Sequence, residues 1–209
     1  MITMKRKSNL LFLTLSAVFI AIIAIMCFTQ IGYLKFGIVE ITLISIPVAF
    51  GGALLGKWGG LLLGTAFGVS SFLQCFGFST FGTTLFSISP FKTFLVCLVP
   101  RMLAGFLSAL FFEMFSKKGK LPAAVNGLIS FFIAAAVNTI GFVGLLVLFF
   151  SETEYIQSIA TQLGAKNMLM FAVLFAGVNA LVEAASCTAC GAALGPVAKK
   201  LKKQMGDLK

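Results

Sequence analysis

The sequence predicts an all-α integral membrane protein: one compact bundle of six transmembrane helices in a single domain, residues 1–209, with both termini in the cytoplasm. Of the 209 residues, 59% are hydrophobic and only 11% are charged, whereas charged residues make up about a quarter of a soluble domain. The mean hydropathy is +1.07. The apolar residues also fall into six runs, close to the length of about 20 residues that crosses a bilayer.

Each predicted helix corresponds to one apolar run. In chain order the runs are Leu10–Gln30, Ile38–Leu55, Gly59–Cys75, Phe91–Phe115, Pro122–Phe150 and Asn167–Val197. The first run follows a basic cluster, as the core of a signal peptide would. Its apolar stretch exceeds the about 7–15 residues of such a core and lacks a small-x-small cleavage site. We therefore expect it to remain as a helix.

The basic residues indicate which connections face the cytoplasm. They cluster before the first run, after the second and fourth runs, and in the tail, at Lys5–Lys7, Lys57, Ser116–Lys120 and Lys199–Lys203. The alternate connections contain Lys35, Lys92 or the acidic segment SETEY. By the positive-inside rule the clusters and both termini are cytoplasmic. The net charge of +10 does not indicate nucleic-acid binding, because no continuous basic stripe with interleaved aromatics is present.

Small residues at regular spacing predict close helix packing. Gly60, Gly64 and Gly68 recur every four residues in the third run and clear one helix face for a neighbouring backbone. Ala17 and Ala21 have the same spacing in the first run. Spacing alone favours internal packing for these alanines as well.

Polar residues inside the runs predict a ligand site. A charge at mid-depth costs at least about 2.5–3.5 kcal/mol on insertion scales, so Arg101, nine residues beyond Lys92, must face a partner or a watery cavity. Further polar candidates in the runs are Asn138, Asn179, Glu183, Gln74 and Ser71. The connection Phe76–Pro90 is rich in Gly, Ser, Thr and Phe, a composition that suits a loop closing over a small molecule.

Two interpretations of the buried charges stay open from the residues alone. Arg101 and Glu183 can form a structural ion pair in a membrane assembly protein without a ligand, or Arg101 can compensate a bound anion. In the first case the pair joins helices and the polar amides satisfy one another. In the second case the polar residues converge on a cavity with apolar walls, as a ligand site requires.

The chemistry of the chain disfavours an enzyme, and we expect no catalytic residue, metal or cofactor. It has no His, and its one Asp is Asp207 in the tail, so the usual acid–base groups and metal ligands are missing. Cys187 and Cys190 have the spacing of a CxxC motif, but without a second pair this is a weak metal signal. The five cysteines are expected to pack as small apolar residues. No phosphate loop with its Lys is present.

Several segments carry a resemblance to a known family. The block IPVAFGGALLGKWGGLLLGTAFGVSSFLQ, followed by SPF and VPRMLAG, resembles the substrate-binding S subunits of prokaryotic energy-coupling-factor (ECF) vitamin transporters. Within that family it looks most like the branch that includes pantothenate carriers. The resemblance covers nearly the whole chain. It implies a multi-pass protein of a prokaryotic cell membrane that captures a vitamin from outside with high affinity.

The resemblance also implies partners. These are a small-molecule vitamin, membrane lipid, a transmembrane coupling subunit and two ATPase subunits, and only the ATPase subunits bind ATP. Ala17 and Ala21 match the family's Ala-x-x-x-Ala pattern, which implies that they dock against the coupling subunit.

The residue roles follow from the same resemblance. Arg101, by its place in VPR, would hold the carboxylate of pantothenate. Asn138, Asn179 and Gln74 would meet its hydroxyl and amide groups. Another vitamin such as riboflavin or folate is the alternative substrate. If Glu183 neutralises Arg101, the site is uncharged overall, which favours a riboflavin-like or other neutral substrate.

Overall fold

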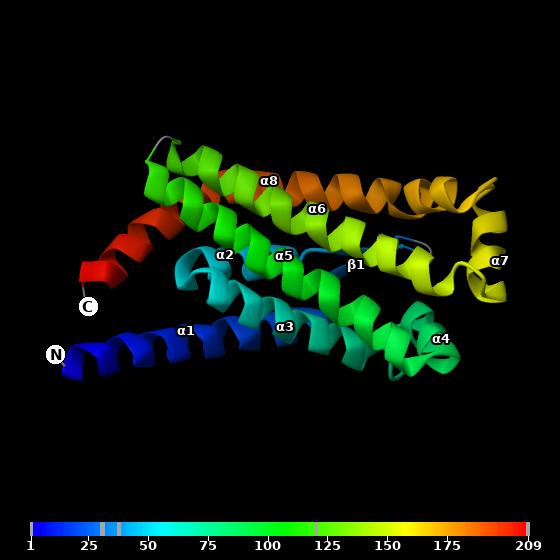
Figure 1. Ribbon diagram of the computed structural model, residues 1–209, viewed down its shortest axis with the longest axis horizontal. Helices are drawn as coiled ribbons and strands as arrows, with labels where there is room; N and C mark the ends of the chain where they lie inside the picture. Colours follow the sequence, from blue (N-terminus) through cyan, green and yellow to red (C-terminus); the bar gives the residue numbers. More distant parts are fainter. Residues whose placement is uncertain (1, 30–31, 37–38, 120, 208–209) are drawn as a thin grey trace.

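The computed structural model describes residues 2–29, 32–36, 39–119 and 121–207. This part of the chain forms eight helices and one two-stranded hairpin. In chain order the elements are α1 (Ile2–Phe28), β1 (Tyr33–Phe36), β2 (Val39–Thr42), α2 (Ser45–Leu55), α3 (Lys57–Gln74), α4 (Thr80–Ile88), α5 (Pro90–Lys118), α6 (Ala123–Phe150), α7 (Glu154–Gln162) and α8 (Met168–Asp207). The long helices run side by side along the longest axis of the molecule (Figure 1).

Four of the described helices are long and apolar enough to cross a membrane. Their apolar segments are Leu10–Phe28, Pro90–Lys117, Ala123–Phe150 and Asn179–Met205, in α1, α5, α6 and α8. The predicted all-α membrane protein is confirmed in part: the described residues are nearly all helical, with one two-stranded hairpin. α2 has only 11 residues, a length of about 16 Å at 1.5 Å per residue, so the count of six crossings stays a prediction.

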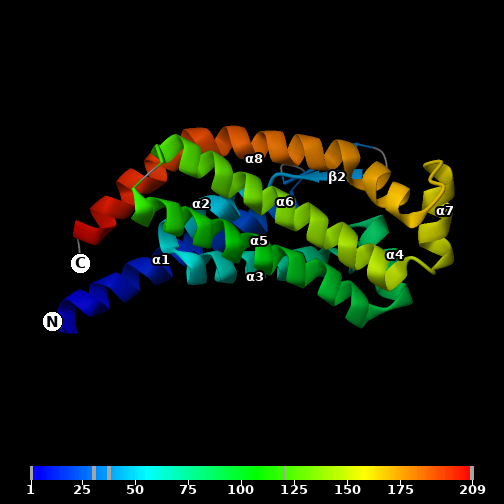
Figure 2. The same cartoon turned by 45° about the horizontal axis from the view of Figure 1, so that its top comes forward.

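The start of α1 and the end of α8 lie at the same end of the molecule, and α4 and α7 lie at the opposite end (Figure 1 and Figure 2). This arrangement is compatible with two termini on one side of the membrane. Their placement in the cytoplasm remains a prediction from the basic residues. The side chains of Lys5–Lys7 lie outside the described part of the structure.

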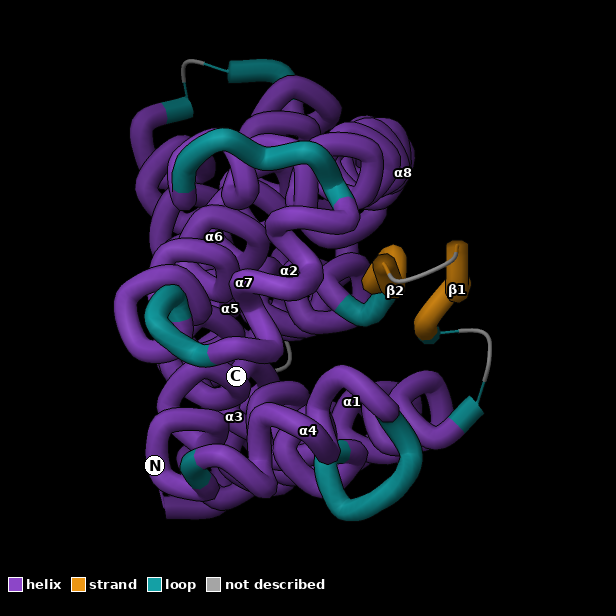
Figure 3. Tube along the Cα trace, turned by 90° about the vertical axis from the view of Figure 1, so that its right-hand side faces the viewer, coloured by secondary structure: helices purple, strands orange, loops and turns teal. Residues whose placement is uncertain are grey.

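The continuous helix predicted for Ile38–Leu55 is wrong. Its first part is β2, which pairs antiparallel with β1 in a register from Tyr33↔Thr42 to Phe36↔Val39. The helix α2 begins only at Ser45, and the hairpin lies beside the helices (Figure 3). The VEIT segment of β2 contains three β-branched residues, which favour a strand. Periodicity alone does not separate such a short apolar strand from the start of a buried helix.

Two segments predicted as loops contain helices. The Ser79 hydroxyl caps α4 by accepting a hydrogen bond from the Gly82 amide at 3.3 Å. The Thr153 hydroxyl caps α7 by accepting one from the Ile156 amide at 3.4 Å. Ser and Thr are preferred N-cap residues because their side-chain oxygens satisfy the first orphan amides of a helix. The segment Phe76–Pro90 is therefore a structured element and not an open loop.

Glycines set the spacing between the long helices. A Cβ on Gly60 would collide with the carbonyl oxygen of Gly105, and a Cβ on Gly64 with that of Arg101. The predicted glycine seam of α3 therefore packs on α5, as expected for small residues at helix interfaces. Gly127 of α6 meets Gly191 of α8 in the same way. These contacts bring the backbones of α3, α5, α6 and α8 close together.

An apolar cluster fixes α4 and α7 at the end of the bundle. Leu85 of α4 and Ile156 of α7 belong to the same buried cluster as Phe150 and Phe171. Burial of such side chains stabilises the folded state by about 1.5–3 kcal/mol each. α4 is thereby held over the same end of α5, α6 and α8 that contains the polar residues described below.

Candidate substrate-binding site

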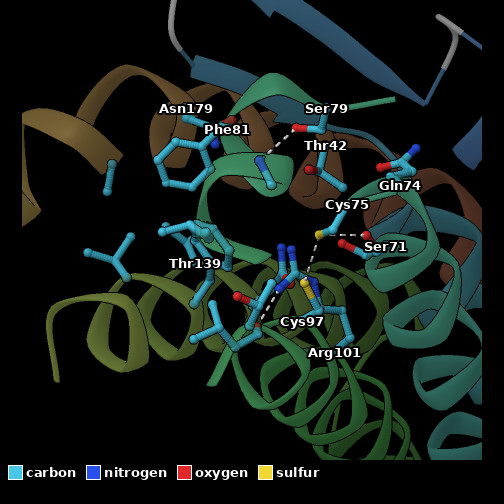
Figure 4. A pocket seen from close by; sticks show the side chains of 18 of the residues that line it. Thr42, Ser71, Gln74, Cys75, Ser79, Phe81, Cys97, Arg101, Thr139 and Asn179 are labelled. Atoms are coloured by element: carbon cyan, nitrogen blue, oxygen red, sulfur yellow. Dashed lines mark hydrogen bonds between the residues drawn. The ribbon is translucent and has the colours of Figure 1, made fainter. Parts of the chain in front are cut away.

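A cavity of about 100 Å³ lies toward the α4 end of the molecule, between α3, α4, α5, α6 and α8 (Figure 4). One water needs about 10–15 Å³ of such volume, so the space exceeds a single solvent site. All six residues predicted to contact substrate line this cavity: Ser71, Gln74, Arg101, Asn138, Asn179 and Glu183. They come from four helices, and their role in binding remains a prediction.

Arg101 is oriented by an interruption in its own helix. Pro100 has no amide hydrogen, so the carbonyl of Val96, four residues earlier, has no helical donor. The Arg101 Nη1 atom donates to that carbonyl at 2.8 Å and replaces the missing bond. Arg101 is 6% exposed. The VPR segment therefore both buries the guanidinium and turns it along α5.

The surroundings of Arg101 provide aromatic faces but no carboxylate in direct contact among the described side chains. Its Cζ atom lies 5.5 Å from the ring centroid of Phe67 and 4.8 Å from that of Phe142, distances at which a cation is attracted to the ring face. Its Nε atom is buried without a hydrogen-bond partner. No carboxylate among the described side chains lies within 4.0 Å of the guanidinium. The direct Arg101–Glu183 ion pair considered from the sequence is therefore not formed.

Glu183 is satisfied by neutral donors. Its Oε1 accepts hydrogen bonds from Ser45 Oγ at 2.6 Å and Asn138 Nδ2 at 3.0 Å. Its Oε2 accepts one from Thr139 Oγ1 at 2.9 Å. Glu183 is 1% exposed, and the three bonds join α8 to α2 and α6. Burying a carboxylate costs far less free energy when several donors form hydrogen bonds to it than when it has none.

The remaining polar groups of the wall are only partly paired. Gln74 Nε2 donates to the carbonyl of Cys27 at the end of α1, which ties α3 to α1. The side-chain oxygens of Asn138 and Asn179 are buried and have no hydrogen-bond partner. Arg101 is on the far side of the cavity from Asn179 (Figure 4). Unpaired donors and acceptors thus occur on different walls.

Some features of the site were missed in the sequence. Ser45, a donor to Glu183, lies inside the predicted span Ile38–Leu55 and was not among the polar candidates. The thiols of Cys75 and Cys97 lie 3.9 Å apart in the cavity wall. Cys97 precedes Arg101 by four residues, and this helical spacing places both on one face. This four-residue spacing is the sequence feature that could have predicted Cys97 as a residue of the cavity wall.

The other cysteine pair lies elsewhere. Cys187 is fully buried in an apolar cluster that includes Phe131 and Ala134, and Cys190 is half-buried. Neither belongs to the cavity wall described above. The five cysteines are present as thiols, and the described residues contain no group of three or more metal-binding side chains.

Ala17 and Ala21 are exposed on α1. The opposite face of this helix buries Phe19 and Ile23 in the bundle. The two alanines therefore do not pack inside the bundle of this chain, although their spacing alone favoured internal packing. Their face is open to lipid or to a partner protein.

Comparison with known proteins gives one family. The sequence profile described as ECF transporter, substrate-specific component, matches residues 11–194. The match extends from α1 into α8 and includes every residue of the cavity wall named above. A comparison with curated protein sequences gives no match.

Proposed function

This chain belongs to the substrate-specific component family of ECF transporters, and we propose that it captures a small organic acid, with pantothenate as the best candidate, from outside the cell. Substrate-specific components are the substrate-binding subunits of these transporters and are not enzymes. They work with a small-molecule substrate and a module of membrane and ATPase subunits. The energy for transport therefore comes from partner subunits.

The observation that carries the proposal is that the buried charge of Arg101 has no directly paired carboxylate. The guanidinium lines the cavity, is 6% exposed and has no carboxylate within 4.0 Å among the described side chains. A buried charge without a directly paired counter-charge is destabilising. A ligand carboxylate would supply the counter-charge and could form two charge-assisted hydrogen bonds with the planar guanidinium.

Pantothenate fits the other groups of the wall. It has a carboxylate, two hydroxyl groups and a secondary amide. In the proposed complex Arg101 binds the carboxylate. The hydroxyl and amide groups contact Asn138, Asn179, Gln74 and Ser71, which line the same cavity. The apolar dimethyl group packs against the aromatic and aliphatic part of the wall.

The direction of transport is proposed from the arrangement of the helices. The basic residues at the end of α8 lie at the end of the molecule opposite α4 (Figure 1), and basic residues favour the cytoplasmic side. The cavity then opens toward the outside of a prokaryotic cell membrane, with α4 as its cover. Both termini are cytoplasmic in this orientation, and α2 and α3 complete six crossings.

The proposal assigns the exposed face of α1 to the coupling subunit. Ala17 and Ala21 are separated by four residues and are exposed, so a helix of another subunit can approach the α1 backbone closely. The complete transporter then contains this chain, a transmembrane coupling subunit and two ATPase subunits that bind ATP.

A thermal-unfolding screen of the purified protein tests the substrate. A ligand that binds only the folded state stabilises it by mass action, by about 2.7 kcal/mol at a hundred times its dissociation constant. We expect pantothenate to raise the melting temperature and panthenol, in which an alcohol replaces the carboxylate, to raise it much less. A shift with riboflavin and none with any acid would contradict an anionic substrate. No shift with any vitamin would contradict substrate capture by this cavity.

A further inference from the structure

Resting on the function proposed above, we infer that Glu183 is a positioning residue that turns the carbonyl oxygen of Asn138 toward the ligand. The substrate must then carry, besides its acid group, an O–H or N–H group that donates to this oxygen. This requirement divides the organic acids into two classes, those with a second donor and those without one. The inference depends on contacts of Asn138 and Glu183 that are independent of Arg101.

The carboxylate of Glu183 sets the orientation of the Asn138 amide. The two ends of an amide have nearly the same shape, so their assignment depends on the hydrogen-bond partners. Asn138 Nδ2 donates to Glu183 Oε1 at 3.0 Å, and the hydroxyls of Ser45 and Thr139 also donate to this carboxyl group, which acts as an acceptor in all three bonds. The NH₂ end must therefore face Glu183. The side-chain oxygen of Asn138 then does not contact Glu183, and it is buried without a hydrogen-bond partner.

Glu183 is itself held in place. Ser45 of α2 donates to it at 2.6 Å and Thr139 of α6 at 2.9 Å. Both carboxylate oxygens are therefore occupied, and Glu183 is 1% exposed. Turning the carboxylate toward a ligand would break bonds to two other helices. Glu183 thus acts on the ligand through Asn138.

The two sides of the cavity have opposite hydrogen-bonding character. Arg101, on α5, has only donors, and its Nε atom is unpaired. Asn138, on α6, offers an acceptor, and Asn179, one turn before Glu183 on α8, also has an unpaired side-chain oxygen. A buried acceptor that stays unpaired in the complex weakens binding. Pantothenate has hydroxyl groups and biotin a ureido group that can donate here, whereas nicotinate and lipoate have a carboxylate and no second donor.

The first experiment compares four acids on the purified wild-type protein. Dissociation constants of pantothenate, biotin, nicotinate and lipoate are measured by isothermal titration calorimetry. We expect the tightest ligand to be one with a second donor, and to bind at least about tenfold more tightly than either acid without one. Equal or tighter binding of nicotinate or lipoate would overturn the inference and leave the anionic function intact. Binding of none of the four acids, together with a shift by riboflavin in the thermal-unfolding screen described above, would instead contradict the proposed function.

The second experiment replaces Glu183 with Gln. The new amide can donate to the Asn138 oxygen, so Asn138 can turn its NH₂ group toward the ligand. We expect the tightest acid with a second donor to bind about 10- to 100-fold more weakly, and its preference over lipoate to fall. A purely structural role for Glu183 would weaken both ligands equally, and an unchanged preference would overturn the inference.

A matched control and a second variant complete the test. Glu113→Gln makes the same chemical change in α5, at a carboxylate that pairs with Lys117 at 3.7 Å and does not line the cavity. It should leave the preference unchanged. If Glu183→Gln does not fold, Asn138→Leu removes the acceptor while Ser45 and Thr139 still satisfy Glu183. This variant should lower the preference for acids with a second donor, because only the Asn179 oxygen then remains as an unpaired acceptor, and an unchanged preference would overturn the inference.

Discussion

Replacing Arg101 with Met separates a charge that binds a ligand from a charge that only stabilises the fold. Among the described residues, Arg101 donates a hydrogen bond to the Val96 carbonyl at 2.8 Å and contacts the rings of Phe67 and Phe142. Methionine keeps apolar contact with both rings. It removes the hydrogen bond to Val96 and also a buried charge that lacks a carboxylate partner.

The two interpretations predict different losses of ligand affinity and of protein stability. Removing one member of a buried, hydrogen-bonded charge pair costs about 2–5 kcal/mol of binding, so Arg101→Met should weaken pantothenate binding by about 30- to 4,000-fold. Without ligand, losing the hydrogen bond to Val96 lowers the stability of the folded protein, whereas removing the buried charge raises it. We expect the melting temperature to change by less than about 4 °C, which is about 1 kcal/mol for a chain of this size.

The assay combines calorimetric titration with thermal unfolding of the same samples. Arg101→Lys is the matched variant, because it keeps a positive charge but cannot form the planar bidentate contact, and its affinity should lie between those of wild type and Arg101→Met. A structural ion pair would lose about 3–5 kcal/mol when broken, which lowers the melting temperature by at least about 6 °C. Such a loss, or unchanged pantothenate binding, would refute the reasoning.

Three other substitutions or labelling experiments test the packing, the docking face and the cavity wall. Gly64→Ala places a Cβ against a backbone carbonyl of α5 and should destabilise the protein by about 1–3 kcal/mol in thermal unfolding. The control Gly144→Ala has open space around it and should not destabilise the protein. Equal effects of the two substitutions would contradict the packing of the α3 glycines on α5. Ala21→Phe, on the exposed face of α1, should leave ligand affinity unchanged and lower uptake by cells severalfold, and normal uptake would argue against docking there. Bound pantothenate should slow maleimide labelling of Cys97, which lines the cavity, but not labelling of Cys190, as followed by mass spectrometry. If Cys97 is labelled at the same rate with and without pantothenate, the ligand binds elsewhere.

The long helices were predictable because a bilayer imposes a length and an apolar composition on each crossing. The runs that became α5 and α6 differ from their helices mainly at the ends. The segment before Ser45 was mistaken because an apolar strand and an apolar helix have the same hydrophobicity when both are buried. The helices α4 and α7 were missed although Ser79 and Thr153 occupy positions typical of N-caps.

The site residues were recognisable because polar groups are costly in lipid and therefore face the interior. Arg101 and Glu183 both line the cavity, which the sequence predicted from their depth. Their partners were not predictable from one sequence. The bond from Arg101 to Val96 depends on the local geometry at Pro100, and the bond from Ser45 to Glu183 joins residues that are 138 positions apart. Such long-range pairing is determined by the helix packing.

The central claim is that the buried guanidinium of Arg101 binds the acid group of the transported substrate. A structure of the protein with bound pantothenate tests this claim most directly. The account predicts carboxylate oxygens about 2.7–2.9 Å from the guanidinium nitrogens, with the ligand in the cavity below α4. A ligand bound elsewhere, or a carboxylate that contacts other residues while Arg101 faces away from it, would contradict the account.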